Sequence, residues 1–184
     1  MDIKKTLVKG RLTYKSLTFL ALLIALNIVL GRMLSISTPI TRISLSFLPV
    51  ALGGMLLGPL GGAAVGGLGD LLGALLFPIG AYFPGYTLTA VISGAVFGLF
   101  LSQSPYRLRF TMVSVLFNQA FCSLFLNSLW VCLLTPKKSL GVIVLSRVIQ
   151  CVIMTAVQLV TLHLAAVGLH RTSAFSTLKN RLLN

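Results

Sequence analysis

Long apolar runs separated by short polar turns divide this chain into segments of membrane-spanning length. A helix needs about 20 apolar residues to cross the hydrocarbon core of a bilayer. Prolines stand at the ends of several runs, at Pro59, Pro78, Pro105 and Pro136, and proline interrupts helices and favours turns. The pattern therefore predicts a bundle of six helices. We expect them over roughly 16–34, 47–58, 60–77, 86–102, 110–134 and 140–168.

The second of these helices is short. It follows a polar stretch from Ser35 to Ser46 that contains Arg42, and the pair Gly58-Pro59 ends it. Because it has fewer residues than a full crossing needs, we expect it to be tilted or to span only part of the bilayer.

The composition agrees with a chain that lies in lipid. Hydrophobic residues make up 57% of its 184 residues and charged residues only 9%, whereas an average soluble domain carries about 25% charged residues. A chain so poor in charge cannot cover itself with a water-facing surface. The sequence therefore predicts an all-α integral membrane protein, a single domain that crosses the cell membrane several times.

The charge of the chain is positive and unevenly placed. There are 15 lysines and arginines against two acids, Asp2 and Asp70, for a formal net charge of +13. The cations lie at the ends of apolar runs and not along one soluble face, so no nucleic-acid-binding surface is expected. The larger group flanks both termini and the turn between the fourth and fifth helices: Lys4, Lys5, Lys9, Arg11, Lys15, Arg107, Arg109, Arg171, Lys179 and Arg181. The smaller group belongs to the opposite side: Arg32, Arg42, Lys137, Lys138 and Arg147.

Cytoplasmic segments of membrane proteins are enriched in Lys and Arg. The uneven distribution therefore predicts that both termini are cytoplasmic. We expect a basic N-terminal arm over 1–15, a transmembrane domain over 16–168 and a basic tail over 169–184.

Glycines are concentrated between Gly53 and Gly98, a stretch that holds 13 of the 17 glycines of the chain. Small residues four apart let membrane helices approach closely, and the pairs with this spacing are Gly62-Gly66, Gly69-Gly73 and Gly94-Gly98. The pattern predicts tight packing among the second, third and fourth helices. Glycine also leaves space for a ligand, and the two interpretations are compatible.

The chain has none of the residue sets that catalysis requires. It lacks a Ser-His-Asp set, a phosphate-binding Walker loop and a pair of carboxylates for proton coupling. The three cysteines, Cys122, Cys132 and Cys151, lie in apolar runs without the spacing of a metal or disulfide site. We therefore expect no enzyme, no metal and no cofactor. The protein is then expected to carry a small solute across the membrane. Such a carrier is either passive or energised by a partner. A structural subunit without a ligand remains the alternative.

Arginines and aromatic residues on the outer side suggest a flat, anionic ligand. Aromatic rings stack on planar groups, and guanidinium groups bind carboxylates through charge-assisted hydrogen bonds. Asp70 lies alone in a glycine-rich helix, where an acid is costly and has either a ligand-binding or a structural role. The tyrosines also fit an aromatic belt at the membrane interface. The candidate binding residues are Arg32, Arg42, Asp70, Tyr82, Phe83, Asn127, Trp130, Arg147 and Gln150.

Several segments of the chain resemble the substrate-binding S components of energy-coupling-factor (ECF) vitamin transporters, and most of all the folate family. The loop from Gly80 to Leu88, which reads GAYFPGYTL, carries most of the resemblance. Further matching segments are Phe47-Leu48-Pro49, Gly54 to Pro59, Gly69 to Gly73, Leu76-Phe77-Pro78, Asn127 to Trp130, and Arg147 with Gln150.

This resemblance implies six helices with both termini inside and a pocket near the outer face, covered by the loops between helices 1 and 2 and between helices 3 and 4. It implies that Ala21 and Ala25 form the docking face for a transmembrane T component, which joins two cytoplasmic ATPases. It also implies that the S component topples in the membrane to deliver folate. Another vitamin or a modified base remains an alternative ligand.

Overall fold

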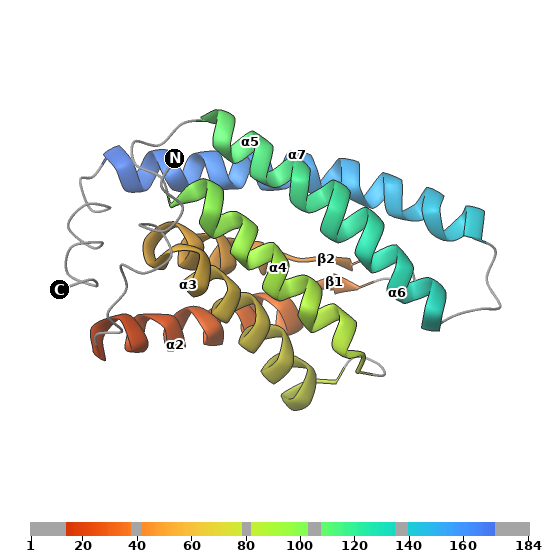
Figure 1. Ribbon diagram of the computed structural model, residues 1–184, viewed down its shortest axis with the longest axis horizontal. Coiled ribbons are helices and arrows are strands. Elements are labelled where there is room, and N and C mark those ends of the chain that lie inside the picture. Colours follow the sequence, from red (N-terminus) through yellow and green to blue (C-terminus); the bar gives the residue numbers. More distant parts are fainter. Residues whose placement is uncertain (1–13, 38–41, 79–81, 103–107, 135–139, 172–184) are drawn as a thin grey trace.

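The protein is a bundle of long helices (Figure 1). Its computed structural model describes residues 14–37, 42–78, 82–102, 108–134 and 140–171. Among these residues, five helical runs are long and apolar enough to cross a membrane. In chain order the helices are α2 (Tyr14–Ile28) with the π-helix η1 (Val29–Met33), α3 (Phe47–Leu76), α4 (Pro84–Leu101), α5 (Leu108–Phe117) with the π-helix η2 (Asn118–Leu126) and α6 (Asn127–Leu134), and α7 (Leu140–Arg171).

The predicted break at Gly58-Pro59 is confirmed inside α3. Gly58 has φ 79° and ψ −168°, a backbone conformation that glycine alone adopts readily. The two arms of α3 fold back on each other there. A Cβ added to Gly53 would lie 2.9 Å from Val65 Cγ2, and one added to Gly66 would lie 3.5 Å from Val50 Cγ1. At 1.5 Å per residue the first arm is about 16 Å long, which is shorter than the roughly 30 Å hydrocarbon core.

A two-stranded hairpin connects η1 to α3. Strand β1 (Ile36–Ser37) pairs antiparallel with β2 (Arg42–Ile43), with Ile36 opposite Ile43. The sequence pattern predicts only a polar connection here, because strands of two residues are too short to show alternation. All the long elements are helical, as predicted, whereas this hairpin and the π-helices η1 and η2 were not predicted.

Glycine packing joins α3 to α4, as the sequence predicts. A Cβ on Gly54 would lie 2.7 Å from the backbone nitrogen of Gly98, and a Cβ on Gly94 would overlap the carbonyl oxygen of Gly62. The two backbones are therefore in direct contact, which side chains at these positions would prevent.

The apolar core occupies one end of the bundle. Its largest fully buried side chains include Phe97, Met55, Leu162, Val65 and Val115. They come from α3 on either side of its reversal, from α5 and from the last parts of α4 and α7, which lie together at the end where α2 begins (Figure 1). The beginning of α2 and the end of α7 thus share one end of the bundle, and the hairpin lies toward the other. The boundaries predicted at 15 and 169 adjoin residues 1–13 and 172–184, which lie outside the described residues.

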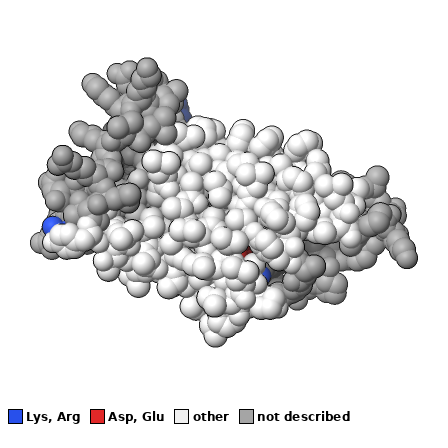
Figure 2. All heavy atoms as spheres, turned by 60° about the horizontal axis from the view of Figure 1, so that its bottom comes forward, with Lys and Arg blue, Asp and Glu red and all other residues white. Residues whose placement is uncertain are grey.

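The outer surface of the bundle is apolar. Large hydrophobic side chains such as Leu60, Phe125, Val152 and Leu164 are more than half exposed. Figure 2 shows a face whose described part is almost free of charged side chains. Such a surface is stable against lipid and not against water, so the protein is an integral, multi-pass membrane protein.

Candidate ligand-binding site

A cavity of about 560 Å³ lies between the helices at the end opposite the apolar core. Ligand sites in proteins commonly have volumes of about 300–1,000 Å³. Its wall is built from α2 and η1, the segment that leads from β2 into α3, both arms of α3, α4, η2 with the start of α6, and α7. Glycines at the helix contacts, including Gly66 and Gly69, line it directly.

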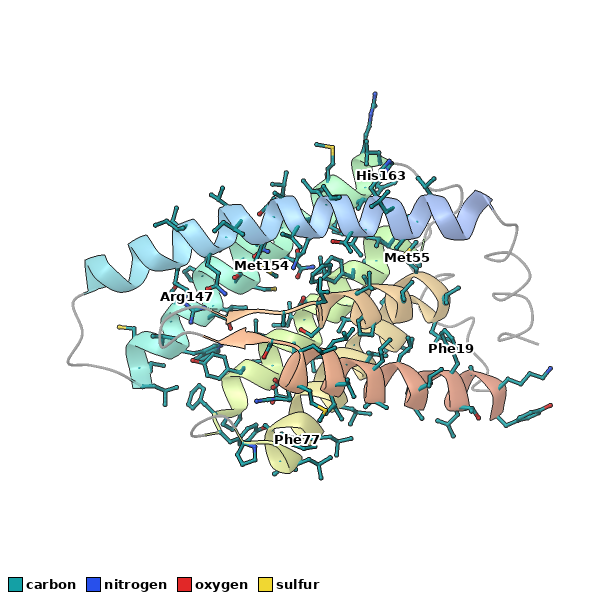
Figure 3. All side chains as sticks on the ribbon, turned by 180° about the vertical axis from the view of Figure 1, so that it is seen from behind. Phe19, Met55, Phe77, Arg147, Met154 and His163 are labelled. Carbon is teal, nitrogen blue, oxygen red and sulfur yellow. The ribbon has the colours of Figure 1, made fainter. Side chains whose placement is uncertain are left out.

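Seven of the nine predicted binding residues lie on the wall of this single cavity. Trp130 is not among the lining residues, and its ring packs behind Phe83, with centroids 5.4 Å apart. Arg42 lies in β2, two residues before the lining residue Ser44, and its side chain is outside the described residues. Figure 3 shows Arg147 on the inner side of α7. The seven are Arg32, Asp70, Tyr82, Phe83, Asn127, Arg147 and Gln150.

Asp70 is the centre of a hydrogen-bonded chain that joins η1, α3 and α4. Its Oδ1 lies 3.4 Å from the Arg32 guanidinium, and its Oδ2 accepts a 2.9 Å hydrogen bond from the Thr87 hydroxyl. The hydroxyls of Thr87 and Tyr82 are 3.1 Å apart. Both carboxylate oxygens are thus engaged within the protein, and the charges of Asp70 and Arg32 compensate each other.

Glycines in α3 give polar side chains of α2 and η1 room to approach. A Cβ on Gly73 would lie 3.1 Å from Arg32 Nε, and one on Gly69 would overlap the Asn27 amide. Asn27 Nδ2 donates a 3.1 Å hydrogen bond to the Val65 carbonyl. The predicted pair Gly69-Gly73 therefore does more than bring helices together, because it makes space for the polar part of the cavity wall.

Arg147 is the cation of the cavity that has no carboxylate partner among the described residues. Asp70 is the one acid among them, and it pairs with Arg32. The Nε atom of Arg147 is buried without a hydrogen-bond partner in the described part of the chain. A cation in the interior of a membrane helix costs about 2.5–3.5 kcal/mol on insertion scales. The wall therefore offers an uncompensated positive group to an anion.

An aromatic wall, in which Phe83 and Tyr86 line the cavity and Trp130 packs behind Phe83, borders the half of the cavity that lies farther from the apolar core, here called the outer half. Phe83 contacts Tyr86 edge to face, with centroids 6.2 Å apart. The indole N–H of Trp130 donates a 3.0 Å hydrogen bond to the Thr89 hydroxyl. A Cβ on Gly85 would lie 2.7 Å from Trp130 Cδ2, so glycine at this position lets the indole lie against the backbone of α4.

Buried amide side chains form the inner part of the wall, and the sequence analysis did not include them. They are uncharged and lie within apolar runs, which is the signal that was available in the sequence. Gln158 lies 11 residues after Arg147 on α7, which places it about 16 Å deeper at 1.5 Å per residue. The residues concerned are Asn27, Asn118, Gln119 and Gln158.

Both π-helices contribute to the cavity wall. Gly31 and Arg32 come from η1, and Asn118, Gln119 and Cys122 come from η2. A π-helix breaks the 3.6-residue period and turns side chains away from the direction that an α-helix would give them, and such segments are frequent at functional sites.

The predicted docking residues lie outside the cavity. Ala21 and Ala25 are both exposed on α2, and residues four apart share one face of a helix. They leave a flat strip on the outer surface of the bundle.

Comparison with known proteins identifies similar chains. Residues 11–171 match the family model described as "ECF-type riboflavin transporter, S component". The folate transporter FolT of Clostridium novyi (strain NT) is 36% identical over 145 residues, which are 79% of this chain and 84% of that protein. The folate transporter FolT of Leuconostoc mesenteroides subsp. mesenteroides is 30% identical over 127 residues, 68% of each chain.

A solved structure described as FolT bound with folic acid has the same fold. It superposes with a TM-score of 0.75 at 30% sequence identity. The match covers 80% of this chain and 88% of that chain.

Proposed function

Because the chain belongs to the family of S components of ECF-type transporters, we propose that it captures folate on the outer side of the cell membrane and delivers it inward. The resemblance stated from the sequence is thereby confirmed at the level of the family. Members of this family are subunits of transporters and not enzymes. Folate suits the cavity because it combines a flat pterin, an aromatic linker and a glutamate with two carboxylates.

The observation that supports this proposal most strongly is Arg147, which has no carboxylate partner among the described residues and lies beside the aromatic wall. A carboxylate of folate would compensate the guanidinium through charge-assisted hydrogen bonds. Phe83 and Tyr82 would contact the rings, and Asn127 and Gln150, which also line the outer half, would bind polar atoms of the ligand. Asp70 would hold Arg32 in place.

Riboflavin is the second candidate, because the matching family model is described by that vitamin. Its ring system is flat, as is pterin. Riboflavin carries no carboxylate, however, and its binding would leave Arg147 without a counter-charge. The relatives named as folate transporters and the uncompensated arginine favour folate over riboflavin and over other vitamins or modified bases.

Titration calorimetry of the detergent-purified protein tests this choice. We expect folate to bind at least tenfold more tightly than riboflavin. Replacement of Arg147 by Ala is expected to weaken folate binding at least tenfold, because the ligand carboxylate loses its cation. The matched control is Arg109→Ala, since Arg109 is exposed at the start of α5 and does not line the cavity.

Each outcome of that titration bears on a different statement. Unchanged folate affinity in the Arg147→Ala protein would remove this residue from the site. Tighter binding of riboflavin than of folate would mean that riboflavin, and not folate, is the ligand. If no vitamin binds, the ligand-free structural subunit becomes the better interpretation.

We also propose the coupling that the family implies. The chain would cross the membrane six times with both termini cytoplasmic, if the short first arm of α3 is counted as a crossing. A T component would dock on Ala21 and Ala25 and join two cytoplasmic ATPases, whose ATP hydrolysis resets the toppled S component. Replacing both alanines by Leu is expected to abolish co-purification of these partners and to leave folate binding unchanged. Ala120→Leu, at an exposed alanine of η2, is the matched control that retains the partners.

A further inference from the structure

Asn118 and Gln158 present unsatisfied hydrogen-bond acceptors on the cavity wall. Both side chains line the cavity and are only 5% and 8% exposed. Asn118 Oδ1 and Gln158 Oε1 are buried, and neither atom has a hydrogen-bond partner among the described residues. The amide orientation of Asn118 follows from its Nδ2, which donates to the Ser93 carbonyl at 3.4 Å and leaves Oδ1 available. A buried polar atom without a partner is destabilising, so both oxygens favour a ligand that brings N–H donors.

The two ends of the cavity differ in charge. The outer part holds Arg32, Asp70 and Arg147, whereas the lining residues at the level of Asn118 and Gln158 are uncharged in the described part of the chain. A carboxylate is stabilised beside a guanidinium and is strongly destabilised among neutral amides in an apolar surrounding. An elongated ligand with one anionic end and one neutral end therefore has a single favourable direction of entry.

We propose that Asn118 and Gln158 determine the specificity of the site by accepting hydrogen bonds from the 2-amino group and N3–H of the pterin, so that folate binds with its ring inward and its glutamate outward. This inference rests on the proposed function. The 2-aminopyrimidin-4-one edge of pterin carries two adjacent donors, and the inner wall offers two buried acceptor oxygens without a partner among the described residues. The isoalloxazine ring of riboflavin carries one N–H between two carbonyl oxygens, and those oxygens would face the amide oxygens unfavourably. The inner amides thus select for folate independently of Arg147.

The test combines a ligand change with a protein change. Calorimetry would compare folate with an analogue in which hydrogen replaces the 2-amino group, on the full-length protein and on its Gln158→Leu variant. We expect the unmodified protein to bind the analogue at least tenfold more weakly than folate, because sites built for a donor reject ligands that lack it. In the Gln158→Leu protein, folate binding falls at least tenfold and the preference over the analogue shrinks to less than threefold.

Thr111→Val is the matched control. Thr111 Oγ1 is also buried without a partner among the described residues, but Thr111 does not line the cavity. This variant is expected to keep both the folate affinity and the preference for the 2-amino group. A thermal-unfolding curve for each variant establishes that it is folded. If Gln158→Leu does not fold, Asn118→Leu takes its place in the same comparison, with the same expected results.

The outcomes separate the inference from the proposed function. If the unmodified protein binds folate and its analogue equally well, or if Gln158→Leu keeps the full preference, then the amides do not recognise the pterin edge and folate capture stands. If the unmodified protein does not bind folate, the proposed function fails.

Discussion

The two halves of the bundle are built on different principles. Where α3 meets α4, glycines bring the backbones into contact, and 61% of the apolar window of α3 is buried. In α7 the corresponding share is 17%, and the side chains that line the cavity are polar and long. The first half has few rotatable groups at its interface, whereas the second presents flexible side chains. We therefore expect α3 and α4 to provide a fixed support and η2, α6 and α7 to adapt to a ligand.

The largest effect is expected from a side chain placed in the glycine interface. Gly94→Leu would drive its Cβ into the Gly62 carbonyl, and overpacking of this kind costs about 1–3 kcal/mol or more. We expect a clear loss of thermal stability or of folded protein. Gly168→Ala is the opposite control, because a Cβ there meets no atom within 4 Å and alanine favours a helix. Equal stability of the two variants would contradict a rigid α3–α4 half.

Asp70→Asn tests the hydrogen-bonded chain that links the support to the cavity. The variant leaves Arg32 without its counter-charge. Because both side chains are partly exposed, we expect a loss of about 1–2 kcal/mol in stability, below the range for fully buried pairs. Folate affinity is expected to change less than threefold. A tenfold loss of affinity at unchanged thermal stability would instead show that Asp70 contacts the ligand.

Gly85→Ala probes the place where the fixed and the adaptable halves meet. The added methyl group would displace the Trp130 indole, whose Cδ2 lies 2.7 Å from the Cβ position. We expect folate binding to weaken about threefold to tenfold with little change in stability, because the indole is only partly buried. The measurement is a folate titration followed by tryptophan fluorescence, since Trp130 is the only tryptophan of the chain. An unchanged emission spectrum would place the indole elsewhere.

The smallest effect is expected on the lipid-facing surface of the adaptable half. Phe117, Phe121 and Phe125 stack along α5 and η2 with centroids 5.4 and 5.9 Å apart, and all three are exposed. Phe121→Leu keeps an apolar side chain in lipid, so folate affinity and stability should stay within twofold and about 0.5 kcal/mol. A larger loss would mean that a partner or a second copy covers this surface.

The sequence predicted the parts of the fold that depend on local chemistry. Proline and glycine marked the helix ends and the reversal at Gly58, because both residues act on their own backbone. Small residues four apart predicted the α3–α4 contact. Arg147 and the GAYFPGYTL loop pointed to one region, and the structure places Arg147 and the loop residues Tyr82, Phe83 and Tyr86 on the wall of the same cavity.

Features that depend on distant contacts could not be predicted. Arg32 and Asp70 are 38 residues apart, and nothing in either segment indicates that their charges meet. A pattern with a 3.6-residue period does not reveal the π-helices η1 and η2. The directions of the Asn118 and Gln119 side chains could therefore not be predicted. In the sequence, Gln158 is one polar residue within an apolar run. Only the three-dimensional structure shows that it lines the cavity.

The apolar core at one end of the bundle has a consequence for how a bound ligand leaves the cavity. The cavity-lining residues of α7 run from Arg147 to Gln158, about 16 Å along the helix, which is roughly half the thickness of a 30 Å hydrocarbon layer. The other end of the bundle is filled by Phe97, Met55 and Leu162, and interiors packed so closely do not part to form a channel at low cost. We therefore describe the cavity as open at one end of the bundle and closed by the apolar core at the other. Under the proposed function, we expect the ligand to leave through the opening by which it entered, once that opening faces the other compartment.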